Sequence, residues 1–210
     1  FPYEMKGWNV AYDYGKFIFE ESEYREILNR YPEYKKFFKI ILGGQELLNG
    51  GLRYCLWLKD YDFNELLKLE FIKDIIVDVK KLRLQASDKG THRLAERPHQ
   101  FRDLNNPKHY LAIPKTSSEN RDYIPMGYLD ESIIPADSLR IIDTESISLF
   151  GILSSSFHIV WMKLVSGRLK SDFRYSKNLS YNTFPFPKIS KSIEEELEER
   201  AYHILEVRER

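Results

Sequence analysis

Residues 110–143, YLAIPKTSSENRDYIPMGYLDESIIPADSLRIID, decide the fold class, because they place several short apolar runs close together along the chain. The runs at 110–114, 123–129 and 139–143 are separated by proline and polar residues, a pattern typical of short strands joined by turns. Helical patterns lie on both sides of this region. We therefore expect an α+β fold, in which a short-stranded central sheet region is flanked by amphipathic helices.

The N-terminal third of the chain is predicted to be largely helical. Ser22 is a candidate N-cap for a helix through EYREILNRY, and Pro32 suits the first turn of a second helix, PEYKKFFKIIL. The aromatic and apolar run at 51–58 predicts a strand. Asp62 and Glu65 form a capping-box pattern before FNELLKLEFIKDIIVDVKKLRLQA, which has helical spacing and predicts one long amphipathic helix.

The C-terminal side of the chain also has two helical patterns. The segment 148–167, SLFGILSSSFHIVWMKLVSG, has helical length and ends at a glycine. Ser192 and Glu195 form another capping box, and the residues after them carry one apolar stripe. This stripe predicts a last helix that packs on the domain or leads into a helical tail.

These elements predict one domain over residues 1–187, followed by a C-terminal helix at 188–210. Within the domain, a helical part spans about 1–86 and a mixed α/β part spans about 87–187. A chain of 210 residues is long enough for one domain with an appended subdomain.

The composition is that of an ordinary globular protein, with 42% hydrophobic and 30% charged residues. No apolar run approaches the roughly 20 residues that span a bilayer, so we expect no membrane contact. The single cysteine, Cys55, excludes an internal disulfide and a cysteine-based zinc site. Cys55 is predicted to be a small buried hydrophobic residue, and this cysteine usage favours a reducing, cytoplasmic setting.

The formal net charge is zero, but the charges are arranged in opposed blocks. Residues 80–121 hold 10 Lys and Arg against 4 Asp and Glu, and residues 161–191 hold 7 against 1. Each block therefore carries six positive charges in excess, while the segments between and around them are acidic. Either block could bind an anionic partner. The alternative is that both are solvated surfaces balanced by the neighbouring acids.

No motif of a known catalytic chemistry is present. The chain has no G-x-G-x-x-G, Walker loop, H-E-x-x-H or G-x-S-x-G pattern, and its five histidines lack carboxylates at metal-ligand spacing. Asp13 with Glu33 and Lys35 loosely imitates the D…E-x-K set of metal-dependent nucleases. Alternating charges are routine at the start of an amphipathic helix, which is the competing interpretation.

A polar loop between two predicted strands is a candidate binding element. Its hydroxyl and amide groups can bond phosphate oxygens or base edges, and its cations can displace counterions from a nucleic acid. A simple polar turn is the alternative. The loop residues concerned are Lys115, Thr116, Ser117, Ser118, Asn120 and Arg121.

The stretch SGRLKSDFRYSKNLSYNTFPFP, residues 166–187, is a second candidate. The prolines near its end have a fixed φ and no N–H donor, so they indicate an extended connector before the last helix. Its phosphate-binding candidates are the cations Arg168, Lys170, Arg174 and Lys177, with Tyr175 and Tyr181 as hydrogen-bond donors.

Five ordered blocks of the sequence also resemble a known family. They are GGQELLNGGLRYCLWL, LAERPHQF, YLAIPKTSSENRDYIPMGYL, LFGILSSSFHIVWMKLVSGRLKSDFRYS and YNTFPFP. Together they resemble the target-recognition region of MmeI-like (type IIG/IIL) restriction-modification enzymes, which are class I adenine-specific DNA methyltransferases. The resemblance extends from about residue 43 to residue 187.

The resemblance implies which side chains face double-stranded DNA. They lie in RPHQF, in the loop KTSSENRD and in GRLKSDFRYS. Members of the family often have Glu-Arg-Arg after the paired serines, whereas this chain has Glu-Asn-Arg. Asn120 is therefore either a reader of adenine in the major groove or a turn residue. The implied contacts are Arg97, Lys115, Ser117, Ser118, Asn120, Arg121, Arg168, Lys170, Arg174 and Tyr175.

The resemblance further implies a domain that reads a short duplex sequence and positions it for a methyltransferase catalytic domain of the same parent chain. That domain flips an adenine and methylates it with S-adenosylmethionine, and a nuclease that requires Mg²⁺ is fused to some members. No catalytic motif, and hence no cofactor site, is expected in these 210 residues. The alternative function, from another class, is a protein-interaction or scaffold module that docks a neighbouring domain.

Overall fold

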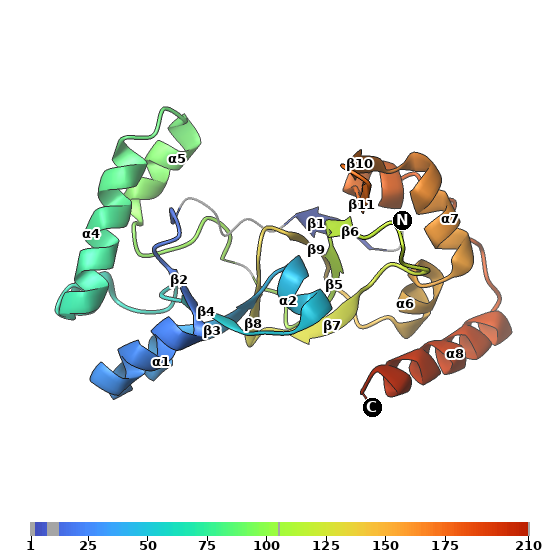
Figure 1. The fold of residues 1–210 in the computed structure, drawn as a ribbon, viewed down its shortest axis with the longest axis horizontal. Helices are drawn as coiled ribbons and strands as arrows, with labels where there is room; N and C mark the ends of the chain where they lie inside the picture. The colour runs from blue at the N-terminus through green and yellow to red at the C-terminus, as the bar shows by residue number, and fades with distance from the viewer. Residues whose placement is uncertain (1–2, 8–12, 105, 210) are drawn as a thin grey trace. The chain divides into compact units, whose positions relative to one another are not determined.

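The computed structural model describes residues 3–7, 13–104 and 106–209, which fold into two compact units. The N-terminal unit comprises residues 8–106 and 131–137, and the C-terminal unit comprises 1–7, 107–130 and 138–210. The chain thus passes between the two units several times. Both units contain helices and strands, so the α+β prediction is confirmed (Figure 1).

The N-terminal unit is built on a four-stranded sheet with the order β2-β4-β3-β8. β2, β4 and β3 pair antiparallel, and β8 joins the edge of β3 in parallel. The strands are β2 (Ile18–Glu20), β3 (Phe38–Leu42), β4 (Arg53–Leu56) and β8 (Ile133–Pro135). The helices are α1 (Glu21–Arg30), η1 (Pro32–Phe37), α2 (Gly44–Asn49), α3 (Phe63–Leu66), α4 (Glu70–Leu84), α5 (Lys89–Arg93) and η2 (Leu94–Glu96).

The sequence predicts part of this unit correctly. The strand expected at 51–58 is confirmed as β4, and Cys55 is fully buried within it. The helix expected from Pro32 to residue 42 is wrong beyond Phe37, because FKIIL forms β3 instead. This apolar run pairs with β4 on one side and β8 on the other. A short continuous apolar run is compatible with either a helix or a central strand, so the sequence pattern alone does not separate the two.

The helix starts in this unit are also partly as predicted. Asp62 is an N-cap as expected, since its carboxylate accepts hydrogen bonds from the backbone N–H groups of Asn64 and Glu65. However, that helix ends at Leu66, and α4 begins separately at Glu70. Ser22 is not a cap, because α1 already begins at Glu21.

A buried arginine joins α4 to the segment that follows it. Arg83 is fully buried, and its guanidinium donates hydrogen bonds to the carbonyls of Leu94, Arg97 and Gln100 at 2.8–3.0 Å. A buried cation needs such acceptors, because an unpaired guanidinium in the core would be strongly destabilising. Arg83 therefore fixes the turn after η2 against α4.

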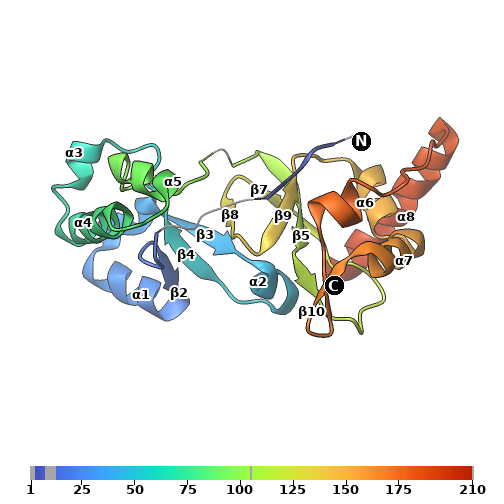
Figure 2. The same cartoon turned by 90° about the horizontal axis from the view of Figure 1, so that it is seen from above.

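The C-terminal unit contains two sheets (Figures 1 and 2). The larger is antiparallel with the order β1-β9-β5-β7, and the smaller has the order β10-β11-β6. The strands are β1 (Met5–Gly7), β5 (His109–Pro114), β6 (Thr116–Ser117), β7 (Gly127–Asp130), β9 (Leu139–Ile142), β10 (Gly167–Leu169) and β11 (Asp172–Arg174). The helices are α6 (Ile147–Leu153), α7 (Ser156–Val165), the π-helix η3 (Lys177–Tyr181) and α8 (Lys191–Glu209).

The expected strands at 110–114 and 139–143 are confirmed as β5 and β9, and the run at 123–129 becomes a strand only from Gly127. One face of the larger sheet and the helices form a shared core. Sheet residues Leu111 and Ile142 pack there with Phe150 of α6 and Met162 of α7. Alternating strand residues supply this face, as expected for strands with a period of two.

The segment 148–167 forms two helices instead of the single helix predicted. α6 and α7 are bent by 56° across Ser154 and Ser155. The Ser155 hydroxyl accepts a hydrogen bond from the His158 N–H at 3.2 Å and so caps α7. Serine competes for backbone hydrogen bonds in this way, which explains the break. In the part of the chain that the structure describes, no single helix is long and apolar enough to cross a membrane.

α8 packs on α6 through part of its predicted apolar stripe, while Ile193 and Ile204 of that stripe are exposed. Ala201 is buried in the core, and Leu197 lies against Gly151 so closely that a Cβ at that glycine would be 2.9 Å from the leucine side chain. Arg208 donates a hydrogen bond to the Met126 carbonyl at 2.8 Å. The last helix is thus part of the C-terminal unit.

Candidate nucleic-acid interface

Pairing of β6 with β11 brings the two cationic segments of the sequence together. Thr116 is opposite Arg174 and Ser117 is opposite Phe173. The Tyr175 N–H donates to the Lys115 carbonyl at 2.8 Å, which extends the ladder by one residue. The loop at 115–121 and the hairpin of β10 and β11 therefore form one surface, although about fifty residues separate them in the sequence.

Arg168 of β10 belongs to this surface and is held in three ways. Its guanidinium forms an ion pair with Glu119 at 3.0 Å, donates to the Ser171 carbonyl at 2.9 Å, and lies 4.3 Å from the centre of the Phe173 ring. Half of the side chain remains exposed. Glu119 thus links the loop to the hairpin, a role that no pattern in the sequence indicates.

Two further predicted cations are exposed and available to a ligand. Lys170 lies at the turn between β10 and β11 with a φ of +57°, and Arg174 extends outward from β11, between the buried residues Phe173 and Tyr175. Within the described residues, neither side chain makes an ion pair. The hairpin therefore presents positive charge that no neighbouring acid neutralises.

The loop after β6 has a tight conformation in which two buried polar atoms lack partners within the described part of the chain. The Asn120 N–H donates to the Ser118 hydroxyl at 3.3 Å, and the Arg121 N–H donates to the Ser118 carbonyl at 3.2 Å. The Ser117 hydroxyl and Arg121 Nε are buried and have no hydrogen-bond partner among the residues that the structure describes. Buried donors in this state are commonly completed by a ligand or by water. Asn120 itself is exposed.

Tyr175 and Arg97 lie in different surroundings from the other candidates. Tyr175 is only 3% exposed, and its hydroxyl lies 2.9 Å from His158 Nε2 in the core of the C-terminal unit. Arg97 belongs to the N-terminal unit and donates to the carbonyls of Phe101 and Arg102 at 2.8 and 2.7 Å. Both side chains are occupied by contacts within the protein.

The hydrogen bond between His158 and Tyr175 anchors the end of the β10–β11 hairpin to α7. Burial lowers the pKa of His158 to about 4, so its imidazole is neutral near pH 7. Burial also raises the pKa of Tyr175 well above its ordinary value. A neutral hydrogen-bonded pair can be placed in the core without an uncompensated charge, and it joins α7 to the end of β11.

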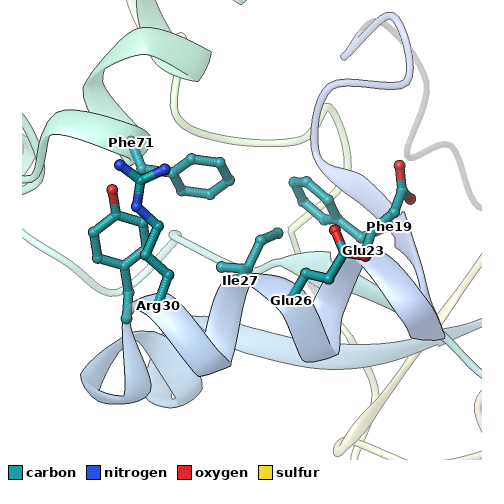
Figure 3. Close-up of a pocket in the computed structure, with 7 residues that line it drawn as sticks. Phe19, Glu23, Glu26, Ile27, Arg30 and Phe71 are labelled. Carbon is teal, nitrogen blue, oxygen red and sulfur yellow. The ribbon is translucent and has the colours of Figure 1, made fainter.

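A hollow of about 410 Å³ in the N-terminal unit has a different character (Figure 3). Its walls include the rings of Phe19 and Phe71 above Ile27 of α1, with Glu23 and Glu26 on its rim. These two carboxylates oppose the binding of an anion. Arg30 at the other end is stacked on Tyr31, 5.3 Å from the ring centre.

The residues of the nuclease-like pattern have local roles. Asp13 is 4% exposed and accepts a hydrogen bond from the Phe17 N–H at 3.1 Å, and burial raises the pKa of its carboxyl group. Glu33 is exposed in the first turn of η1. Among the described residues, no three His, Cys, Asp or Glu side chains form a group that could hold a metal ion.

Known proteins resemble the chain over nearly its whole length. DNA methyltransferase A of Bacillus subtilis (strain 168) is 42% identical over 202 residues, which are 96% of this chain and 23% of that protein. The solved structure of the type IIL restriction-modification enzyme MmeI in complex with DNA has a TM-score of 0.94 and 36% identity. It matches 99% of this chain with 28% of its own length.

A more distant structure shares the fold alone. The type IIG restriction endonuclease BpuSI is 10% identical with a TM-score of 0.56, over 95% of this chain and 25% of its own. The chain thus spans about a quarter of the length of each of these proteins. Residues 3–188 match the family described as MmeI, target recognition domain. The chain belongs to the MmeI target recognition domain family.

Proposed function

We propose that this chain recognises a specific sequence in double-stranded DNA and positions the duplex for an adenine-specific methyltransferase domain of the same parent chain. The pairing of β6 with β11 carries the proposal, because it joins the loop and the hairpin into one cationic surface. Kinship with a DNA methyltransferase and with an enzyme solved on DNA supports it. That kinship also implies S-adenosylmethionine as the parent's cofactor, with Mg²⁺ where a nuclease is fused.

The surface suits a duplex for electrostatic and geometric reasons. Lys170 and Arg174 are exposed without acidic partners among the described residues, and the half-exposed Arg168 is already held in place by Glu119. Cations in this arrangement neutralise backbone phosphates and release counterions. The loop around Ser118, Asn120 and Arg121 adds directional donors and acceptors, which are the groups that read base edges.

The direct test replaces Arg168 and Lys170 together by alanine in the full chain and measures duplex affinity against salt concentration. We expect affinity to fall at least tenfold at low salt, because two phosphate contacts are lost. The slope of log affinity against log salt should become shallower by about two units. A thermal melt should show that the variant remains folded.

The matched control is the double variant Arg25→Ala with Lys68→Ala. Both side chains are exposed, each forms an ion pair with an acid three or four residues before it, and both belong to the N-terminal unit. This control removes the same charge from elsewhere and should bind nearly as well as the wild type. Equal losses in the two variants, or no salt-sensitive binding by the wild type, would contradict the proposal.

A second candidate function, docking of a neighbouring domain, is favoured by one face of α7. Phe157, Val160 and Leu164 follow helical spacing, and each side chain is more than half exposed. The matched relatives are about four times longer than this chain, so the catalytic part of the parent is the proposed occupant. Leu164→Ser should weaken that association while leaving the melting temperature of the isolated chain unchanged.

A further inference from the structure

Arg140, on β9, occupies a position on the larger sheet where a cation is unexpected. It is paired with Gly7 on β1 and lies two residues before Ile142, which belongs to the core. Paired and alternating residues share a face, so Arg140 extends from the same face of the sheet as that core residue. Arg140 interrupts the apolar strand LRIID, so the sequence pattern does not mark it as a binding residue.

The guanidinium lies against the backbone of β1. A Cβ atom on Gly7 would be 2.5 Å from Arg140 Nη1, a distance that real Cβ contacts do not reach. A residue with a side chain would therefore displace the guanidinium. The absence of a Cβ at Gly7 lets Arg140 occupy this place.

Arg140 lacks the acceptors that structural arginines of this protein have. Arg83 and Arg97 donate to backbone carbonyls, whereas no hydrogen bond or ion pair of the Arg140 guanidinium is formed within the described part of the chain. Its Nε is buried without a partner. Leaving such a donor unsatisfied is unfavourable, so the site is incomplete without an acceptor.

A second arginine lies near Arg140. Lys115 N–H donates to the Ser138 carbonyl at 2.8 Å, and Pro114 is opposite Leu139, so β9 adjoins the start of β6. Thr116 in turn is opposite Arg174. Burial lowers the pKa of Arg140, and so does the positive charge of Arg174, which is close enough to act on it.

The chemistry of the pair specifies an anion. Repulsion between two guanidinium groups that form no ion pair within the described residues is offset by a negative group that accepts several N–H bonds, and phosphate has the matching geometry. A base edge is neutral, so it would satisfy a donor without offsetting the repulsion. The expected ligand is therefore a phosphate.

We propose that Arg140 and Arg174 together bind a backbone phosphate of the duplex, as a contact that is independent of the base sequence. This inference rests on the proposed function and extends its surface from the hairpin to β9. The contact would fix the position of the duplex relative to the sheet, while neighbouring loop residues read bases.

The test measures duplex binding by the full chain with Arg140→Gln, Arg140→Lys and Gly7→Ala. Arg140→Gln should weaken binding about tenfold, by the same factor on every duplex, and should reduce the salt slope by about one unit. Arg140→Lys should recover part of the affinity. Gly7→Ala keeps the charge but displaces the guanidinium, so it should weaken binding without lowering the net charge.

Arg200→Gln is the control, because this substitution removes the same charge elsewhere. Arg200 is exposed on α8 and pairs with Glu196. It should leave binding unchanged. Wild-type affinity and slope in both Arg140→Gln and Gly7→Ala would overturn the inference, while salt-sensitive binding by the wild type would leave the proposed function standing. Stabilisation by inorganic phosphate at constant ionic strength, with duplex binding unaffected by Arg140→Gln, would also overturn it.

Discussion

Arginine side chains in this chain differ by what their guanidinium groups meet. Arg83 donates hydrogen bonds to three backbone carbonyls, and Arg97 donates to two. Arg168 forms an ion pair with Glu119 and lies over the Phe173 ring. The sequence cannot separate these cases, because backbone carbonyls are the acceptors and folding alone places them. The resemblance to relatives led to Arg97 and Arg168 alike, and it missed Arg140, which lies inside an apolar strand.

His158 makes stability depend on pH. Burial lowers its pKa to about 4, below the ordinary value of 6.5, so the unfolded chain binds a proton more readily than the folded one. The contribution of the neutral His158 to the free energy of unfolding is complete above pH 6.5 and is lost as the pH falls towards 4. The loss amounts to about 3 kcal/mol over that interval.

The measurement compares thermal melts of wild type and His158→Gln at pH 7 and at pH 4.5. We expect the melting temperature of the wild type to fall more than that of the variant, because the variant has no imidazole to protonate. Carboxylates titrate in both proteins and cancel in the comparison. Parallel pH profiles would show that His158 does not contribute.

At the scale of elements, local patterns predicted strands better than helix boundaries. β4, β5 and β9 lie where apolar runs are bounded by turn residues. β3 was mistaken for a helix, because only its pairing with β4 and β8 reveals it as a strand. β6, β10 and β11 are two or three residues long and were too short to be predicted.

Gly151 sets the distance between α6 and α8. A Cβ there would lie 2.9 Å from Leu197 Cδ1 and 3.4 Å from the Ala201 Cβ, so Gly151→Val should push α8 away. We expect a loss of about 1–3 kcal/mol in the free energy of unfolding. Urea denaturation measures this loss, and limited proteolysis should cut α8 earlier in the variant.

The control combines Gly151→Val with Leu197→Ala, which makes space for the new methyl groups. It should recover part of the lost stability, since the two residues are in contact and their effects are not additive. Independent, additive losses would mean that α8 is not held at this point.

At the scale of the whole molecule, each unit is built from segments that are far apart in the sequence. Residues 131–137 leave the C-terminal unit and add β8 to the sheet of the N-terminal unit. β1, at the other end of the sequence, pairs with β9. Composition and periodicity are local quantities and cannot report such distant pairings. The prediction of a helical part over about 1–86 remains a prediction.

The folding unit extends beyond the matched family region, which ends at residue 188. Removing α8 would expose the core around Phe150, where Ala201 and Leu205 now pack. We expect a chain of residues 1–188 to aggregate or to melt well below the full chain, because the lost apolar burial is not replaced. Soluble expression and calorimetry of the two lengths decide this, and equal melting temperatures would contradict it.

The ladder between β6 and β11 has a practical meaning for protein engineering. In a chimaera, residues 115–121 would come from a relative while residues 166–174 remain those of this chain. The strand pairing and the ion pair between the two segments would then join residues from different proteins. Mismatched halves would misalign the graft even when every transplanted side chain is correct. Under the proposed function, exchanging both segments together is therefore the expected route to a new specificity.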